Sequence, residues 1–182
     1  MELLGVAGSL RRGSYNRKML QAAGALLPPG VRFTEYDGLK AIPAFDADDE
    51  ASLPPAVSHW RAAVERADGI LFATPEYNSS VPGQLKNAVD WASRPVATAV
   101  LRYKPVAVIG ASTGMFGAVW SQAELRKALA SAGARVLDRE LPLPAAHEAF
   151  DENGSLKDHD LTLKVQGVIT DLVGSVSQRL AA

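Results

Sequence analysis

Polar side chains that could bind a ligand gather in three short segments of the sequence, each directly after an apolar run. The first segment is GSLRRGSYN (8–16), the second is PEYNSS (75–80) and the third is GASTGMFG (110–117). Hydroxyls, amides, guanidinium groups and glycine-rich backbone are the groups with which proteins bind anions and polar heterocycles. The three segments together therefore indicate a binding site, provided that the fold brings them to one place.

The first segment has the composition of a phosphate site. Ser9, Ser14 and Asn16 offer side-chain donors, and Arg11 or Arg12 offers positive charge. A helical pattern follows, and the N-terminus of a helix presents free N–H groups and the positive end of its dipole. The segment matches neither the G-x-G-x-x-G nor the G-x-x-x-x-G-K-[ST] pattern, so we expect a phosphate site of another type. The alternative is that Ser14 or Asn16 only caps the helix.

The second segment suits a flat, polar ring. Pro75 and Pro82 restrict the backbone on both sides, which holds the N–H and C=O groups between them in place. Tyr77 can supply an aromatic face or edge, and Asn78 and Ser79 can reach ring heteroatoms. The alternative is an ordinary turn with exposed polar residues.

The third segment fits the pattern G-x-S-x-G, with Ser112 at the position of a hydrolase nucleophile. Asp138 and His147 follow in the order Ser, Asp, His, so a serine esterase is a remote alternative. That interpretation leaves the first two segments without a purpose. We favour the interpretation that Gly110, Ser112 and Gly114 let the backbone approach a ligand closely.

The elements that must position these segments alternate between apolar, strand-like runs and amphipathic helical runs. The pattern predicts strands at 3–7, 31–36, 69–73, 105–110 and 135–137, and helices at 16–27, 56–66, 84–93, 119–132 and 158–180. Strands that are apolar on both faces and separated by helices form parallel sheets covered on both sides. The sequence thus predicts an α/β, flavodoxin-like three-layer sandwich with strand order 2-1-3-4-5, whose ligands bind at the carboxyl ends of the strands.

Composition narrows the class of protein further. With 182 residues, of which 47% are hydrophobic and 21% charged, we expect a single domain over residues 1–182. A net charge of −1 without a basic run argues against a nucleic-acid partner. The chain has no cysteine, which excludes disulfides and thiolate metal sites. No apolar run has the roughly 20 residues of a membrane helix, and no signal peptide is evident, so we expect a cytoplasmic protein without a membrane partner.

The motifs GSLRRGSYN and TPEYNSSVPGQLKNAVDW, at this spacing, closely resemble the NADPH-dependent FMN reductase family, in particular its quinone and chromate reductase branch. The likeness continues through STGMFGAVWSQ and the Leu125-Arg126 pair, so it covers most of the chain. Two positions depart from the family pattern. Gly117-Ala118 stands where a glycine pair is usual, and Ser79 stands where aromatic residues are common.

The resemblance implies non-covalently bound FMN and assigns the residues that would hold it. By the family pattern, the first segment binds the ribityl phosphate, the second lines the isoalloxazine ring, and the third completes the site. The cofactor-binding residues so implied are Ser9, Arg11, Ser14, Tyr15, Asn16, Pro75, Glu76, Tyr77, Asn78, Ser79, Ser112 and Gly114.

The activity that the resemblance implies is an NAD(P)H oxidoreductase in which FMN performs the hydride chemistry. NADPH or NADH would be the donor, and a small-molecule acceptor such as a quinone, chromate, an azo compound or free flavin would take the electrons. No side chain is assigned as a catalytic acid or base, and no metal site is expected. The alternative is an electron carrier without its own NAD(P)H reaction. Such carriers are typically strongly acidic, whereas this chain is nearly neutral.

Family resemblance also implies a homodimer or homotetramer with sites near the subunit contacts. An apolar face around Trp91 and the helix from Trp120 would suit such a contact, and ordinary core packing of these residues is the alternative.

Overall fold

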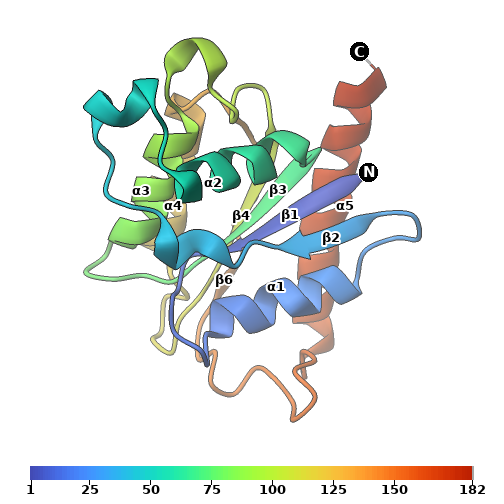
Figure 1. Ribbon diagram of the computed structural model, residues 1–182. Coiled ribbons are helices and arrows are strands. Elements are labelled where there is room, and N and C mark those ends of the chain that lie inside the picture. The colour runs from blue at the N-terminus through green and yellow to red at the C-terminus, as the bar shows by residue number, and fades with distance from the viewer. Residues whose placement is uncertain (182) are drawn as a thin grey trace.

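The computed structural model describes residues 1–181 and has one parallel sheet at its centre (Figure 1). Five strands follow the order β2-β1-β3-β4-β5, which is the flavodoxin-like order that the sequence predicts. A sixth strand pairs with β4. The strands are β1 (Glu2–Ala7), β2 (Arg32–Glu35), β3 (Gly69–Thr74), β4 (Pro105–Ala111), β5 (Arg135–Val136) and β6 (Pro142–Leu143).

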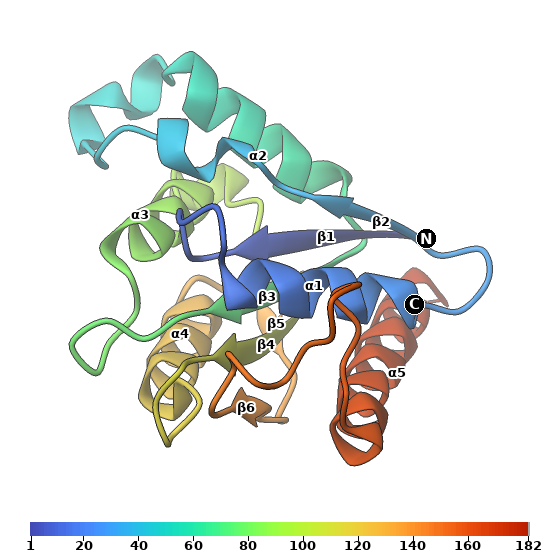
Figure 2. The same ribbon diagram turned by 90° about the horizontal axis from the view of Figure 1, so that it is seen from below.

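Helices cover both faces of the sheet, which makes three layers (Figure 2). One face carries α1 and α5, and the opposite face carries α2, α3 and α4. The helices are α1 (Tyr15–Ala25), α2 (Pro55–Arg66), α3 (Gly83–Ala92), α4 (Val119–Ser131) and α5 (His159–Ala181). The fold class is therefore confirmed.

The central strands are buried because helices pack on both of their faces. In β1, Leu4 and Val6 join the core beneath α2, α3 and α4, whereas Leu3 and Ala7 join the core beneath α1 and α5. Successive side chains of a strand point to opposite faces, so an unbroken apolar run supplies both cores at once. Such runs fix β1, β3 and β4 in the middle of the sheet, and their carboxyl ends carry the three polar segments.

The sheet has one strand more than the sequence analysis expected. β5 pairs only with Pro105 and Val106, at the beginning of β4. The far end of β4, at Gly110 and Ala111, pairs instead with β6. A two-residue strand that begins with proline has no period-two pattern, so nothing in the sequence marks β6 as a strand.

Two further findings differ from the expectations. The segment 37–55 contains two short 3₁₀ helices, η1 (Gly38–Ala41) and η2 (Ala47–Ala51), and a third, η3 (Val96–Thr98), follows α3.

Trp91 is fully buried in the core, and its indole N–H donates to the Pro43 carbonyl at 2.9 Å. Trp91 therefore belongs to the core and does not form part of a surface for subunit contact. No helix within residues 1–181 is long and apolar enough to span a bilayer.

Candidate functional site

A cavity of about 300 Å³ lies at the carboxyl ends of β1, β3 and β4, where the three polar segments meet. This is the edge at which parallel α/β sheets bind their ligands. Asn78, Ser79 and Gly114 are outside its lining, although each is within two residues of a lining residue in the chain. Predicted site residues from all three segments do line it: Ser9, Arg11, Ser14, Tyr15, Asn16, Pro75, Glu76, Tyr77 and Ser112.

The first segment forms a loop with unused hydrogen-bond donors at the start of α1. Ser14 is the N-cap of α1, and its hydroxyl oxygen accepts from the Arg17 N–H at 3.3 Å. Ser9 accepts from the Arg11 N–H at 3.4 Å, so both hydroxyls still have a proton to donate. Within residues 1–181, the backbone N–H groups at 12–16 form no hydrogen bond. Free N–H groups at the positive end of a helix dipole suit a phosphate.

Positive charge beside this loop is held by aromatic rings. The Arg11 guanidinium lies 5.3 Å from the centre of the Tyr15 ring, and the Lys18 ammonium lies 5.9 Å from it. The Tyr15 ring stacks in turn on Phe150, at a centroid distance of 6.4 Å. Neither Lys18 nor Phe150 could be predicted at this site, since no pattern in the sequence indicates that residue 150 returns to α1. The stack keeps Arg11 at the rim of the cavity through cation–π attraction.

Asn16 has a structural role that the sequence did not reveal. Its side-chain N–H donates to the Ala111 carbonyl at 2.9 Å, and its oxygen accepts from the Ala111 N–H at 2.9 Å. This buried pair of hydrogen bonds joins the first turn of α1 to the end of β4. One amide hydrogen of Asn16 is left for a ligand, so the residue mainly fixes the first loop against the third.

The second segment is a tight turn. Tyr77 and Ser80 exchange two backbone hydrogen bonds of 3.2 and 3.1 Å, with Asn78 and Ser79 between them. Both central residues have positive φ, 53° and 60°, as in a type I′ turn. Their backbone N–H groups form no hydrogen bond within residues 1–181. The turn therefore presents rigid backbone donors beside the Tyr77 ring, which is 51% exposed.

Glu76 caps a helix from a distance. Its carboxylate accepts from the N–H groups of Trp120 at 3.0 Å and Ser121 at 3.2 Å, in the first turn of α4. Ala118, the N-cap of α4, has no side chain that could do this. An acceptor at the first turn satisfies N–H groups that the helix cannot, and its negative charge suits the helix dipole. The missing cap at Ala118 is a signal in the sequence that could have revealed this role.

The third segment is held by β6 and by α4. The Ser112 N–H donates to the Leu143 carbonyl at 3.0 Å. The side-chain N–H of the fully buried Gln122 donates to the carbonyls of Gly117 at 3.2 Å and Ala118 at 3.4 Å. A Cβ at Gly117 would lie 2.6 Å from the backbone nitrogen of Leu143, so only glycine fits there.

The interactions of a hydrolase triad are absent from residues 1–181. Asp138 forms an ion pair with Arg126, and His147 lies 3.3 Å from Glu148. The hydroxyl of Ser112 donates only to the Gly114 carbonyl, at 3.5 Å. A serine nucleophile needs hydrogen bonds from serine to histidine and from histidine to an acid. The structure therefore gives the esterase alternative no support.

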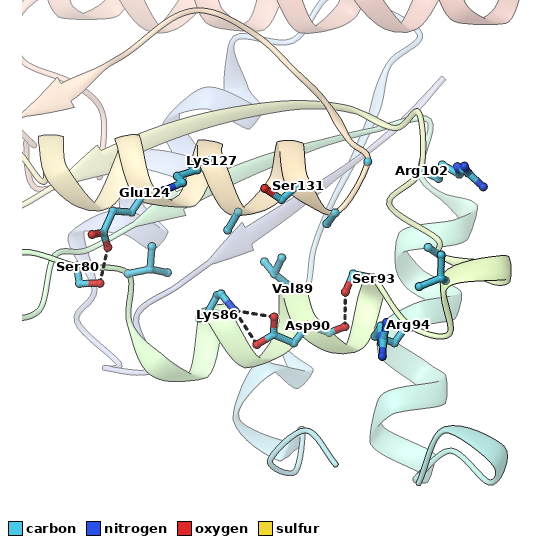
Figure 3. A pocket seen from close by; sticks show the side chains of 16 residues that line it. Ser80, Lys86, Val89, Asp90, Ser93, Arg94, Arg102, Glu124, Lys127 and Ser131 are labelled. Atoms are coloured by element: carbon cyan, nitrogen blue, oxygen red, sulfur yellow. Dashed lines mark hydrogen bonds and ion pairs between the residues drawn. The ribbon is translucent and has the colours of Figure 1, made fainter. Parts of the chain in front are cut away.

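A second, larger hollow of about 690 Å³ lies between α3 and α4 (Figure 3). Lys86 and Asp90 on α3 face Glu124 and Lys127 on α4, and the floor between them is apolar. The Ser80 hydroxyl donates to Glu124 and joins the turn of the second segment to this hollow. It lies on the helical face rather than at the sheet edge, away from the phosphate-type loop.

The cavity at the sheet edge has the donors that FMN requires. Free N–H groups, two serine hydroxyls and Arg11 suit the phosphate, while the rigid turn at 77–80 suits the polar edge of a flat ring. An α/β sheet with such a site at its carboxyl edge defines a flavodoxin-like, nucleotide-binding class of protein.

Comparison with known proteins gives the family. Residues 1–148 match the NADPH-dependent FMN reductase family, and the chain belongs to it. An NAD(P)H-dependent FMN reductase of Pseudomonas aeruginosa is 44% identical over 160 residues, covering 87% of this chain and 85% of the relative. A 2-hydroxy-1,4-benzoquinone reductase of Burkholderia sp. is 36% identical over 156 residues, covering 85% of each chain.

Among solved structures, the flavoenzyme NAD(P)H:(acceptor) oxidoreductase FerB of Paracoccus denitrificans superposes with a TM-score of 0.89. It is 32% identical in sequence, and the match covers 97% of both chains. The expected family, fold, enzyme class and FMN cofactor with NAD(P)H as donor are thereby confirmed.

Proposed function

We propose that this chain acts as a single domain over residues 1–182 that reduces quinones with electrons from NAD(P)H, with FMN in the cavity at the sheet edge. The observation that carries the proposal is the meeting of three ligand-type loops in that cavity. A relative named as a benzoquinone reductase supports the choice of acceptor. Cytoplasm is the proposed location, since the nicotinamide nucleotide donor is found there.

In this chemistry the protein binds FMN and orients it. When bound, FMN supplies the redox chemistry, in which NAD(P)H and a proton convert a quinone into a hydroquinone with transfer of two electrons. The N–H groups at 12–16, Ser9, Ser14 and Arg11 would hold the phosphate. The free N–H groups of Asn78 and Ser79 would donate toward the polar edge of the ring, where negative charge develops on reduction.

The experiment is to load the purified protein with FMN, desalt it, and add NADPH and then NADH in the absence of oxygen. We expect the yellow flavin absorbance to survive desalting, to bleach with one or both nucleotides, and to return when 1,4-benzoquinone is added. Flavin that is retained but bleached by neither nucleotide would indicate the electron carrier. Protein that elutes without flavin would contradict the proposed site.

We also propose that the chain forms a homodimer or homotetramer through the hollow between α3 and α4. Charges of both signs, Lys86 and Lys127 against Asp90 and Glu124, surround its apolar floor. A patch of this kind is complementary to itself across a two-fold axis. Light scattering after gel filtration tests this.

We expect a multiple of the monomer mass for the native chain, and the monomer mass for Ala128→Arg in the hollow. Ala123→Arg, on an exposed position of α4 outside the hollow, is the matched control and should keep the native mass. A monomeric native chain, or an Ala128→Arg variant with the native mass, contradicts the proposed contact.

A further inference from the structure

We propose that an exposed aromatic pair, Phe116 and Trp120, binds the organic acceptor at the mouth of the flavin cavity and selects neutral planar acceptors over inorganic anions. This inference rests on the proposed function and adds to it a binding surface and a substrate class. Phe116 is 56% exposed and Trp120 is 45% exposed, and their rings meet edge to face with centroids 4.8 Å apart.

Exposed apolar side chains concentrate at this edge of the molecule. Tyr77 belongs to the turn of the second segment, and Met115, which is 81% exposed, precedes Phe116 in the third. Leu10 in the first segment is also exposed. All of these residues lie in or beside the three loops that form the cavity. Exposed apolar groups gathered around the mouth of one cavity indicate a binding surface.

Proximity along the chain and hydrogen bonds place Phe116 and Trp120 beside the cavity. Glu76, which lines the cavity, accepts a hydrogen bond of 3.0 Å from the backbone N–H of Trp120. Thr113 also lines it, three residues before Phe116. The Val119 N–H donates to the Phe116 carbonyl at 3.3 Å, which holds the turn that brings the two rings together.

The charges around the pair favour an uncharged acceptor. The carboxylate of Glu76 lies under the first turn of α4, and Glu124 stands one helical turn beyond Trp120. Residues four apart share a face of a helix, so Glu124 borders the aromatic surface. An inorganic anion there would meet two carboxylates and two apolar rings, whereas a neutral quinone can stack on the rings.

The test compares two acceptors with opposite chemistry, 2-methyl-1,4-naphthoquinone and ferricyanide, using the FMN-loaded protein with NADPH. Phe116→Ala and Trp120→Ala should each lower kcat/KM for the naphthoquinone by about tenfold, because an aromatic contact is lost. For ferricyanide kcat/KM should stay unchanged, as should the amount of FMN retained. Trp120→Phe should restore most of the naphthoquinone activity.

Tyr103→Ala is the matched control. Tyr103 is an aromatic residue that is 64% exposed, two residues before the start of β4 and therefore at the opposite edge of the sheet. The Tyr103→Ala substitution should leave kcat/KM unchanged for both acceptors.

Two results would overturn the inference. One is an equal change in kcat/KM for both acceptors in Phe116→Ala and Trp120→Ala, and the other is an unchanged kcat/KM for the naphthoquinone. If the pair forms a subunit contact instead, the variants should show the first result together with a changed mass in light scattering. If the native protein fails to oxidise NADPH at all, the proposed function fails separately. Calorimetric titration of the naphthoquinone into the FMN-loaded protein then decides the inference, which stands only if the double variant Phe116→Ala/Trp120→Ala binds at least tenfold more weakly.

Discussion

At the scale of single residues, several side chains that the sequence marks as ligand contacts also hold the site together. Glu76 lines the cavity and caps α4, and Asn16 lines it and fixes the end of β4. These roles could not be predicted, because each depends on a partner 44 to 95 residues away. The location of the site could be predicted, because each polar segment directly follows an apolar strand.

Glu76→Ala should lower the free energy of unfolding by about 1 kcal/mol, as the loss of other helix caps does. The physical reason is that the N–H groups of Trp120 and Ser121 lose their acceptor. Glu76→Gln is the matched control, since its amide oxygen can still accept and should preserve most of the stability. Urea unfolding measures both, and equal stability of Glu76→Ala and the native chain would show that the cap contributes nothing.

At the scale of elements, the strands that carry the site were predictable because β1, β3 and β4 are unbroken apolar runs. β6 was missed because two residues cannot show a period. The start of α4 has an unusual backbone conformation. Its N-cap, Ala118, is buried and has a φ of 63°, a left-handed conformation that disfavours residues with a Cβ.

Ala118→Gly should therefore raise the free energy of unfolding by about 1 kcal/mol, because glycine adopts this conformation without strain. Gly117→Ala next to it should do the reverse and destabilise the protein by more, since its Cβ would meet the Leu143 backbone at 2.6 Å. Thermal unfolding of the two variants checks this pair. A less stable Ala118→Gly variant would refute the assignment of strain to the N-cap.

Lys104 joins the start of β4 to the end of α2. Its side chain is 4% exposed and donates to the carbonyls of Glu65, at 3.1 Å, and Ala67. Burial lowers the pKa of Lys104 from 10.5 to about 8, with the nearby Arg179 charge acting in the same direction. Between these two pKa values the unfolded chain binds more protons than the folded one, so stability should rise as the pH increases from about 8 to 10.5.

Urea unfolding across this pH range measures the rise. Lys104→Met should not show this rise in stability with pH, because the substitution removes the titrating group. Lys164→Met, at an exposed position of α5, should keep the native pH profile. Parallel profiles for the native chain and Lys104→Met would contradict the account.

At the scale of the whole molecule, one edge of the sheet carries the ligand loops and the exposed aromatic pair, while the hollow between α3 and α4 lies on the helical face. The fold class followed from the alternation of strands and helices along the whole chain. The surface for subunit contact could not be predicted from the sequence. An apolar residue such as Trp91 looks the same in the sequence whether it lies in the core or at an interface.

We propose that the loop at 8–16 holds the phosphate of FMN, and the most direct test is to measure the Kd of FMN for three forms of the protein by calorimetry. Arg11→Ala should weaken binding by roughly 10- to 100-fold, as loss of a hydrogen bond to a charged group does. Arg12→Ala removes the same charge one residue further on, outside the lining of the cavity, and should bind FMN like the native protein. An equal Kd for Arg11→Ala and the native chain would contradict the assignment of this loop to the phosphate.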